Sequence, residues 1–146
     1  ISDGQARGAG RAVGNAGVFS TAPDLARFAE TMLGRGRCDG VRVLSEEIHG
    51  RITRRLTPPH LPARGFGWDL RPPEESPARG ALLSAGAHGH TGWTGQSLWI
   101  DPERELYAIV LTNRTHPFCQ DNHEAAAMAR VPLAGTNWIP GTDSPG

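Results

Sequence analysis

Apolar residues recur at three- and four-residue spacing over residues 23–33, which predicts an amphipathic helix. Its apolar face would consist of Leu25, Phe28, Ala29, Met32 and Leu33. Thr21 can cap the start, Asp24 stands at the capping-box position, and a proline occupies the first turn. Gly34 and Gly36 follow, so the helix is expected to end there.

A short strand or turn at residues 41–44 precedes a second, shorter helix. Ser45 can cap this helix, and Ile48 and Ile52 are its predicted buried positions. Residues 66–70 alternate large side chains and predict a strand. The following segment, residues 71–80, is rich in proline and charge, so we expect an exposed loop.

From residue 87 onward the pattern is typical of strands. Residues 88–92 and 96–100 suit two strands, and Asp101 and Pro102 then begin a type I turn. Residues 106–111 form a near-continuous apolar run, as expected for a strand covered on both faces. Short connections between consecutive strands predict an antiparallel meander.

The last part of the chain is predicted to form a covering helix and a tail. Residues 121–130 are rich in alanine and suit a helix that covers the meander, whereas residues 132–146 have no periodicity and are expected to be loose. Helices and a largely antiparallel sheet, without a β-α-β crossover pattern, place the fold in the α+β class.

Composition narrows the choice of partners. A chain of 146 residues with 38% hydrophobic residues is long enough for one domain, and its 19 glycines and 12 prolines predict many turns. The net charge is zero, which argues against a nucleic-acid or anionic-membrane partner. No apolar run approaches the ~18 residues of a membrane span. The chain starts at Ile1 without an initiator Met, so we expect a piece of a longer protein, whose compartment, cytoplasmic or exported, stays open.

The stretch Gly-His-Thr-Gly-Trp-Thr-Gly at residues 89–95 is the most informative for chemistry. Three glycines within seven residues weaken a strand and indicate close approach by another backbone or a ligand. His90 and Thr91 would present an imidazole and a hydroxyl to that ligand. A twisted or bulged strand with a surface histidine is the structural alternative.

Five segments, in order from residue 14 to about residue 118, resemble the serine β-lactamases and penicillin-binding proteins. His90-Thr91-Gly92 is similar to their Lys-Thr-Gly element, with His in place of Lys as in many esterase-like members. The other four segments lie at residues 17–28, 67–68, 99–102 and 111–117. Any one match is weak, but the ordered set is specific.

This resemblance implies a partial β-lactamase/transpeptidase-like fold over residues 1–131, with residues 132–146 as the tail. It implies acyl-enzyme chemistry on a small-molecule ester, amide, peptide or β-lactam substrate, without a metal or organic cofactor. His90 and Thr91, with Gly92 completing the motif, would bind the acyl or carboxylate group and sustain proton transfer. The backbone N–H of Trp93 would be an oxyanion-hole donor, an effect of ~3 kcal/mol.

The sequence also departs from the family pattern. It contains no Lys, so the nucleophile motif Ser-x-x-Lys cannot occur in it, and its one tyrosine, Tyr107, lies in a late apolar strand. In the family, both this motif and the Tyr-x-Asn or Ser-x-Asn element come before the region of Gly17. The resemblance therefore implies a C-terminal portion that is inactive alone and needs the N-terminal part of its own domain. With His90 replacing the lysine that would hold a β-lactam carboxylate, an esterase or peptidase is favoured over a true β-lactamase.

Two other functions remain open. A non-catalytic binding or sensor module of the penicillin-recognising type would lack the nucleophile altogether, and sequence upstream of Ile1 would decide. A zinc hydrolase would draw its ligands from His88, His90, His116, Asp121 and His123. No His-Glu-x-x-His motif supports it, so we favour a surface His88 with His90 in the cleft.

Other nucleophiles have weaker support in the sequence. None of Ser20, Ser45, Ser84 and Ser97 stands in a Gly-x-Ser-x-Gly motif. Cys38 and Cys119 have no neighbouring base pattern and are expected to be free thiols, although a disulfide between them stays open.

Overall fold

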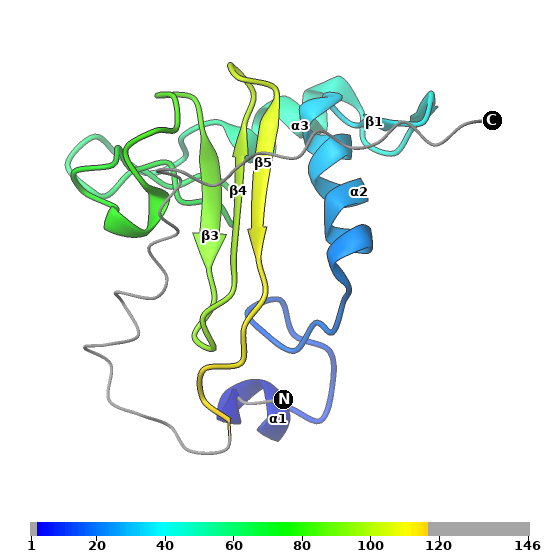
Figure 1. Cartoon of the computed structure of the whole chain (residues 1–146), viewed down its shortest axis with the longest axis vertical. Coiled ribbons are helices and arrows are strands. Elements are labelled where there is room, and N and C mark those ends of the chain that lie inside the picture. The colour runs from blue at the N-terminus through cyan, green and yellow to red at the C-terminus, as the bar shows by residue number, and fades with distance from the viewer. Residues whose placement is uncertain (1–2, 117–146) are drawn as a thin grey trace.

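The structure is a computed structural model that describes residues 3–116, and it confirms the α+β class (Figure 1). The helices are α1 (Gly4–Gly8), α2 (Ala22–Leu33), α3 (Glu46–Thr53) and the 3-10 helix η1 (Pro77–Arg79). The strands are β1 (Arg37–Cys38), β2 (Val41–Arg42), β3 (His88–Thr91), β4 (Ser97–Asp101) and β5 (Leu106–Val110). The helix predicted at 121–130 and the tail at 132–146 lie outside the described residues. No helix within residues 3–116 is long and apolar enough to cross a membrane.

Helix α2 forms where the capping pattern predicts it. The Asp24 N–H donates to Thr21 Oγ1 at 3.3 Å, and the Thr21 hydroxyl donates to Asp24 Oδ2 at 2.9 Å. At the other end, the Gly34 N–H donates to the Glu30 carbonyl at 2.8 Å. Gly36 then has φ +86, and a Cβ there would collide with the Leu44 carbonyl, so the chain leaves the helix through a glycine.

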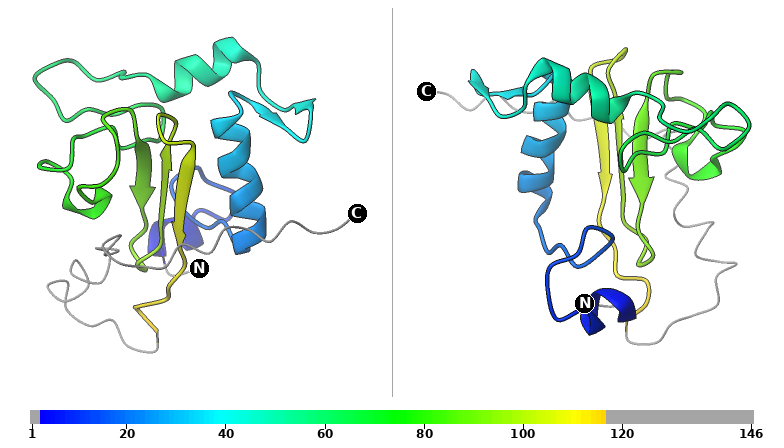
Figure 2. Two further views of the ribbon diagram at one scale, coloured as in Figure 1. Left: turned by 45° about the horizontal axis from the view of Figure 1, so that its top comes forward. Right: turned by 180° about the vertical axis from the view of Figure 1, so that it is seen from behind.

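Helix α3 is capped by Ser45 as predicted, since Ser45 Oγ accepts from the Ile48 N–H at 3.1 Å. Ile52 packs against the main core, but the predicted burial of Ile48 is wrong, because 42% of it is exposed. Figure 2 shows the reason: α3 lies over the end of the sheet and not on its face. Only one of its isoleucines therefore reaches the core.

Strands β3, β4 and β5 form the predicted antiparallel meander in that order. Thr91 lies opposite Ser97, and His90 opposite Leu98. The turn between β4 and β5 is closed by the Asp101 carboxylate, which accepts from the N–H groups of Glu103 and Arg104 at 3.1 and 3.3 Å. The predicted turn residue thus holds the β4–β5 connection.

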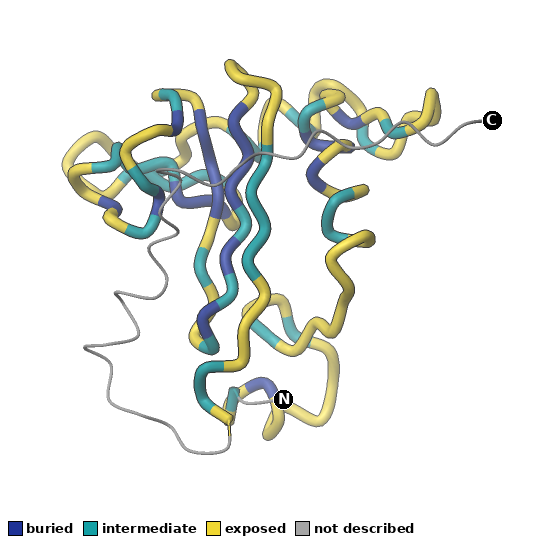
Figure 3. Tube along the Cα trace, in the orientation of Figure 1, coloured by how far each residue is buried: buried dark blue, intermediate teal, exposed yellow. Residues whose placement is uncertain are grey.

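The core lies on both faces of β4, and Figure 3 shows that most of this strand is buried. On one face, Ile100 is fully buried in a cluster with residues from α2 and the loop before β3, namely Ala29, Met32 and Trp68. On the other face, Trp99 packs with Leu83 and Ala87. Strand β5, predicted to be covered on both faces, is only half-buried, because it is an outer strand of the described sheet and α2 packs on one face.

Two predictions for residues 66–80 are wrong. The strand expected at 66–70 is reduced to single bridges of Asp69 with Gly89 and Arg64, because Gly67 turns the chain at φ +81 and leaves Phe66 exposed. The loop expected to be exposed at 71–80 contains two buried side chains, Ser76 and Arg79, each 2% exposed. They are buried because they satisfy polar groups around β3 and β4, as described below.

Candidate active site

The four predicted site residues lie together at the end of β3, and the β3–β4 turn is at the opposite end of the sheet from α3 (Figures 1 and 2). His90 and Gly92 are exposed, Thr91 is half-buried, and Trp93 is 59% exposed. None of the four is packed into the core. The end of β3 is therefore accessible to a ligand.

The turn from β3 to β4 is closed by two backbone hydrogen bonds. The Gly92 N–H donates to the Gln96 carbonyl at 2.7 Å, and the Gly95 N–H donates to the Gly92 carbonyl at 3.0 Å. Gly95 has φ +94, and a Cβ there would collide with the Thr112 hydroxyl. The conformation of Gly92–Gln96 is thus fixed by the chain itself.

Neighbouring groups of the protein account for two of the three glycines that indicated close approach by another backbone or a ligand. A Cβ on Gly89 would collide with the Trp99 ring and the Leu98 carbonyl, and Gly95 is required by the turn. At Gly92 a Cβ would meet only the Gln96 side chain, with Oε1 at 2.8 Å. Close approach by another backbone, one of the two interpretations of these glycines, is therefore confirmed at Gly89, where the Leu98 carbonyl of β4 is the neighbour. At Gly95 the neighbour is the Thr112 side chain, which the sequence pattern does not show.

Two hydrogen-bonding groups at this end have no partner within residues 3–116. No oxygen in residues 3–116 accepts a hydrogen bond from the Trp93 N–H, although the Gly92 and Gly95 N–H groups are both satisfied. The Thr91 hydroxyl likewise makes no hydrogen bond within the described part of the chain. As far as the described residues go, one N–H donor and one hydroxyl at this end of β3 remain available to a ligand.

The His90 ring is oriented by its own strand. Its Nδ1 lies 2.7 Å from the Thr91 carbonyl oxygen, which can only accept, so Nδ1 carries the proton. In the neutral imidazole this leaves Nε2 with its lone pair available. His90 can therefore accept a proton or a hydrogen bond through Nε2.

Arg114 is a neighbour of the site that sequence reasoning missed. Its guanidinium carbon lies 5.1 Å from the centroid of the Trp93 ring, and its backbone N–H donates to the Thr94 carbonyl at 3.1 Å. Strands β3 and β5 both run antiparallel to β4, so the carboxyl ends of these two strands lie at the same end of the sheet. That topology was the signal that could have placed Arg114, which follows β5, beside the end of β3.

His88 is buried, which corrects the expected surface position. It is 3% exposed and contacts the Trp68 ring edge-on, with ring centroids 5.0 Å apart. His88 lies opposite Ile100, on the face that α2 covers, and burial lowers the pKa of its imidazole. The two histidines of β3 thus have different environments.

The zinc alternative finds no ligand set in residues 3–116, where no three His, Cys, Asp or Glu side chains come together to hold a metal. Asp121 and His123 lie outside the described residues. Cys38 is half-buried and forms no disulfide within residues 3–116, and Cys119 lies outside them.

A buried carboxylate anchors the start of β3. Asp69 and Gly89 exchange backbone hydrogen bonds of 2.7 and 3.2 Å. The Asp69 carboxylate accepts from Arg71 at 2.6 Å and from Ser76 at 3.0 Å, and Arg64 lies 3.5 Å away. Burial alone would raise the pKa of Asp69, but these partners lower it to about 2.

A second carboxylate extends this polar cluster to β4. Asp101 is fully buried and accepts from the backbone N–H of Ser84 at 2.7 Å and from its hydroxyl. The buried Arg79 guanidinium donates to the carbonyls of Arg71 and Ser84. The loop before β3 is thereby bound to the sheet by buried hydrogen bonds, although Arg79 Nε has no partner within residues 3–116.

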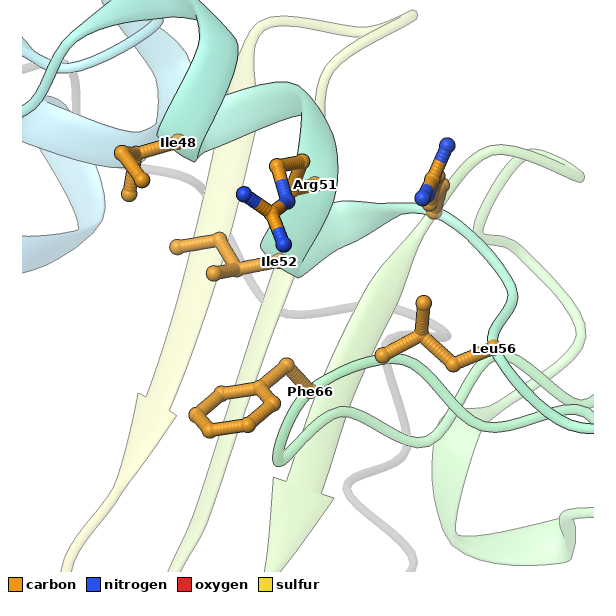
Figure 4. Close-up of a pocket in the computed structure, with 6 residues that line it drawn as sticks. Ile48, Arg51, Ile52, Leu56 and Phe66 are labelled. Atoms are coloured by element: carbon orange, nitrogen blue, oxygen red, sulfur yellow. The ribbon is translucent and has the colours of Figure 1, made fainter.

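The hollow beside α3 is separate from the site. It has a volume of about 280 Å³ and is lined by Ile48, Arg51, Ile52, Arg54, Leu56 and Phe66 (Figure 4). It lies where α3 meets the loop before β3, at the end of the sheet opposite the β3–β4 turn. None of the predicted site residues lines it.

Comparison with known families settles the family. The family model described as Beta-lactamase matches residues 2–131. The chain belongs to the beta-lactamase family. The resemblance inferred from the five segments is thus confirmed, and so is the expected relation to penicillin-binding proteins.

Relatives within this beta-lactamase family carry peptidase names. A protein of Salmonella paratyphi B (strain ATCC BAA-1250 / SPB7), named "Putative D-alanyl-D-alanine carboxypeptidase", is 32% identical over 130 residues. The match covers 86% of this chain and 30% of that protein, and the same values hold for a relative of the same name from Salmonella newport (strain SL254). The chain therefore spans 30% of the length of the curated relatives it matches.

Solved structures of the family show the same fold. A beta-lactamase from Mycobacterium bovis is 28% identical with a TM-score of 0.58, covering 75% of this chain and 42% of that one. A penicillin-binding protein homologue from Caulobacter crescentus has a TM-score of 0.52 at 24% identity, covering 75% of this chain and 30% of that one, which supports the fold alone. The α+β arrangement of this beta-lactamase-family chain is thus shared with both.

Proposed function

We propose that this chain is the C-terminal part of a serine hydrolase domain that works through an acyl-enzyme, and that Thr91–Trp93 form one wall of its acyl-binding site. The observation that carries the proposal is the Trp93 N–H, which has no acceptor in residues 3–116 and stands at the exposed end of β3. Membership of the beta-lactamase family supports it.

The Trp93 N–H is suited to stabilising the oxyanion that forms when a nucleophile attacks a carbonyl. The turn hydrogen bonds of Gly92 and Gly95 hold it in place before any substrate binds. A preorganised donor costs no reorganisation during the reaction, and removing one such donor lowers kcat by about 10²- to 10³-fold. This donor would act together with a second N–H from the nucleophile itself.

His90 would accept a proton, and Thr91 would bind the substrate. With Nδ1 bound to the Thr91 carbonyl, His90 offers Nε2 as a proton acceptor at the open end of the strand. The Thr91 hydroxyl, which makes no hydrogen bond within residues 3–116, would donate to the acyl or carboxylate oxygen of a substrate. General acid–base assistance of this kind is worth about 10²- to 10⁴-fold.

The nucleophile would come from the remainder of the parent domain. The chain has no Lys, so the Ser-x-x-Lys pair is not within it. Tyr107 lies on β5, and its hydroxyl donates a hydrogen bond to Glu30 of α2 at 3.3 Å. It is therefore not the tyrosine of a Tyr-x-Asn element at this site. We expect the isolated chain to be inactive and to need the N-terminal part of its own domain.

A peptide or ester is the favoured substrate class. His90 replaces the lysine that would supply a fixed cation for a β-lactam carboxylate. The relatives named for D-alanyl-D-alanine carboxypeptidase support a peptidase acting on a C-terminal peptide bond.

The test uses the parent protein that contains this chain, with an N-acyl-D-Ala-D-Ala peptide, a p-nitrophenyl ester and nitrocefin as substrates. We expect an acyl-enzyme in mass spectra and faster turnover of peptide and ester than of nitrocefin. Fast nitrocefin turnover with slow ester cleavage would overturn the substrate class. Peptide binding without any adduct would indicate the binding module instead.

The histidine is tested in the same assay. His90→Ala is expected to lower the acylation rate by about 10²-fold, because the proton acceptor is lost. His60→Ala, an exposed histidine in the loop after α3, is the matched control. If the two variants acylate at the same rate, His90 has no role in the site.

A further inference from the structure

The hollow beside α3 is lined by apolar side chains that the described part of the chain leaves uncovered. Of these, Ile48 is 42%, Leu56 49% and Phe66 73% exposed. Ile52 is the exception, because it also packs against the main core. Exposed apolar side chains that gather around one concavity are typical of a ligand site.

The walls of this hollow are held together by backbone contacts. The Phe66 N–H donates to the Ile52 carbonyl at 3.0 Å, and the Leu56 N–H donates to the Arg64 carbonyl at 2.8 Å. Gly65 allows the two segments to approach, since a Cβ there would lie 2.9 Å from the Ile52 carbonyl oxygen. The hollow therefore exists before a ligand binds, and these backbone groups are not available to pair with an added peptide strand.

Two arginines, Arg51 and Arg54, line the same hollow, and Figure 4 shows Arg51 on α3. Arg51 lies 3.9 Å from the Glu47 carboxylate, and both side chains are largely exposed. No Asp or Glu oxygen in residues 3–116 lies within 4 Å of the Arg54 guanidinium. The adjacent Arg55 differs, because its guanidinium donates to carbonyls of the loop at residues 57–61. As far as the described residues go, the hollow thus combines apolar side chains with positive charge that an anion can bind.

Volume and charge together select a ligand class. The volume of about 280 Å³ is close to the lower end of the ~300–1,000 Å³ that small-molecule sites occupy, which suits one short aliphatic chain. The planar fork of a guanidinium matches a carboxylate. We propose that the hollow binds a medium-chain aliphatic carboxylate, with the tail against Ile48, Leu56 and Phe66 and the carboxylate at Arg51 and Arg54.

This site is independent of the proposed acyl-transfer site. It lies at the end of the sheet opposite the β3–β4 turn, so its occupant would not compete with the substrate. A bound carboxylate would cover apolar surface of α3 and of the loop before β3, and it would balance the charge of the two arginines.

The test measures binding of octanoate to the parent protein by calorimetry at neutral pH, with octanol and butyrate as comparison ligands. Octanoate should bind at least about 10-fold more tightly than octanol, which lacks the charge, and than butyrate, which buries fewer methylene groups. No binding of octanoate, or equal binding of octanoate and either comparison ligand, would overturn the proposal.

The arginines are tested by the double variant Arg51→Gln with Arg54→Gln. Octanoate affinity should fall by about 10-fold, because two exposed charge pairs are lost, while octanol affinity should stay the same. The matched control is Arg7→Gln with Arg11→Gln, two exposed arginines in and after α1, at the other end of the molecule. Equal effects of the two double variants would contradict binding in the hollow.

The apolar wall is tested by Phe66→Ala, which should weaken octanoate binding by about fivefold because the tail loses its contact with the ring. Phe19→Ala is the matched control, since Phe19 is also highly exposed, at 81%, but belongs to the loop before α2. If Phe66→Ala binds octanoate as tightly as Phe19→Ala does, the tail does not lie in the hollow.

Two further measurements separate the hollow from other places where octanoate could bind. A parent protein phosphonylated at its nucleophile should bind octanoate unchanged, whereas loss of binding would place the ligand in the acyl-binding site and overturn the proposal. If no adduct forms, the hydrolase proposal fails, and the arginine and phenylalanine variants still test the hollow. Binding to phosphatidylglycerol vesicles without binding of free octanoate would indicate a membrane-facing surface instead.

Discussion

Strand β3 has two ends with opposite character. At its start, His88 and Gly89 are buried, and Gly89 exchanges hydrogen bonds with the buried Asp69 (Figure 3). At its end, Thr91 and Trp93 present groups that no part of residues 3–116 binds. Only three residues separate the anchored Gly89 from the open donor of Trp93, so a rigid strand start can hold the Trp93 N–H in position for a ligand.

The two ends are stabilised by different interactions. The start of β3 depends on long-range contacts, namely the Trp99 ring over Gly89 and the ion pairs of Asp69 with Arg71 and Arg64. The end depends on a local turn, in which the N–H groups of Gly92 and Gly95 donate hydrogen bonds to carbonyls within residues 92–96. Substitutions at the start should therefore lower stability, and those at the end should lower activity.

Replacing a glycine by alanine at each end of β3 gives the largest expected difference in stability between the two ends. Gly89→Ala places a methyl group against the Trp99 ring and the Leu98 carbonyl, and should lower the free energy of unfolding of the parent by about 3 kcal/mol. Gly92→Ala meets only the flexible Gln96 side chain and should cost less than about 1 kcal/mol. Denaturant unfolding checks both, and equal costs would remove the distinction between the ends.

The Asp69 anchor gives the next largest effect. The pKa of Asp69 is lowered from 3.8 to about 2, so the carboxylate stabilises the fold above pH 3.8 by about 2 kcal/mol. This stability is lost as the pH falls from 3.8 through about 2, because protonation breaks the pairs with Arg71 and Arg64. Asp69→Asn should remove this stabilisation by the carboxylate at neutral pH.

Acid titration of unfolding measures the Asp69 contribution. Asp39→Asn is the control, because the Asp39–Arg27 pair is exposed and such pairs contribute little. A variant Asp69→Asn that is as stable as wild type at neutral pH would show that the anchor does not hold the start of β3.

His88 gives a smaller, pH-dependent effect. Burial lowers the pKa of its imidazole below 6.5, so the unfolded chain binds the proton more readily than the folded one. Stability should therefore fall as the pH drops below 6.5, by at most about 1.4 kcal/mol per pH unit. His88→Gln should flatten this slope just below pH 6.5, and an unchanged slope would contradict the burial of a neutral His88.

The smallest effect on stability is expected at the open end. Trp93→Ala removes an exposed ring and its contact with Arg114, which should cost about 0.5–1 kcal/mol in unfolding. Trp93→Phe keeps an aromatic face and should cost less. A larger loss would mean that Trp93 supports the fold and is not only presented to a ligand.

Much of the framework could be predicted from local sequence. The Thr21 and Asp24 pair located the start of α2, and Asp101 located the β4–β5 turn, because capping and turn chemistry act within a few residues. The His90–Trp93 stretch was found from its pattern and from the family resemblance, and the structure places it at an exposed strand end.

Long-range packing explains what could not be predicted. The burial of His88 depends on which face of the sheet α2 covers, and that of Arg79 on carbonyls from Arg71 and Ser84. The charged residues of the segment 71–80 indicated exposure, but Arg71 and Ser76 of this segment donate hydrogen bonds to the buried Asp69 carboxylate. Arg114 reaches Trp93 only because β3 and β5 run in the same direction.

The most direct test of the open end is a crystal structure of the parent protein phosphonylated by a p-nitrophenyl alkylphosphonate. Its phosphoryl oxygen mimics the oxyanion of the tetrahedral intermediate. We predict that this oxygen lies about 2.7–3.1 Å from the Trp93 backbone nitrogen. A covalent adduct whose oxygen is bound elsewhere, with the Trp93 N–H left unoccupied, would contradict the assignment of β3 as the wall of the acyl-binding site.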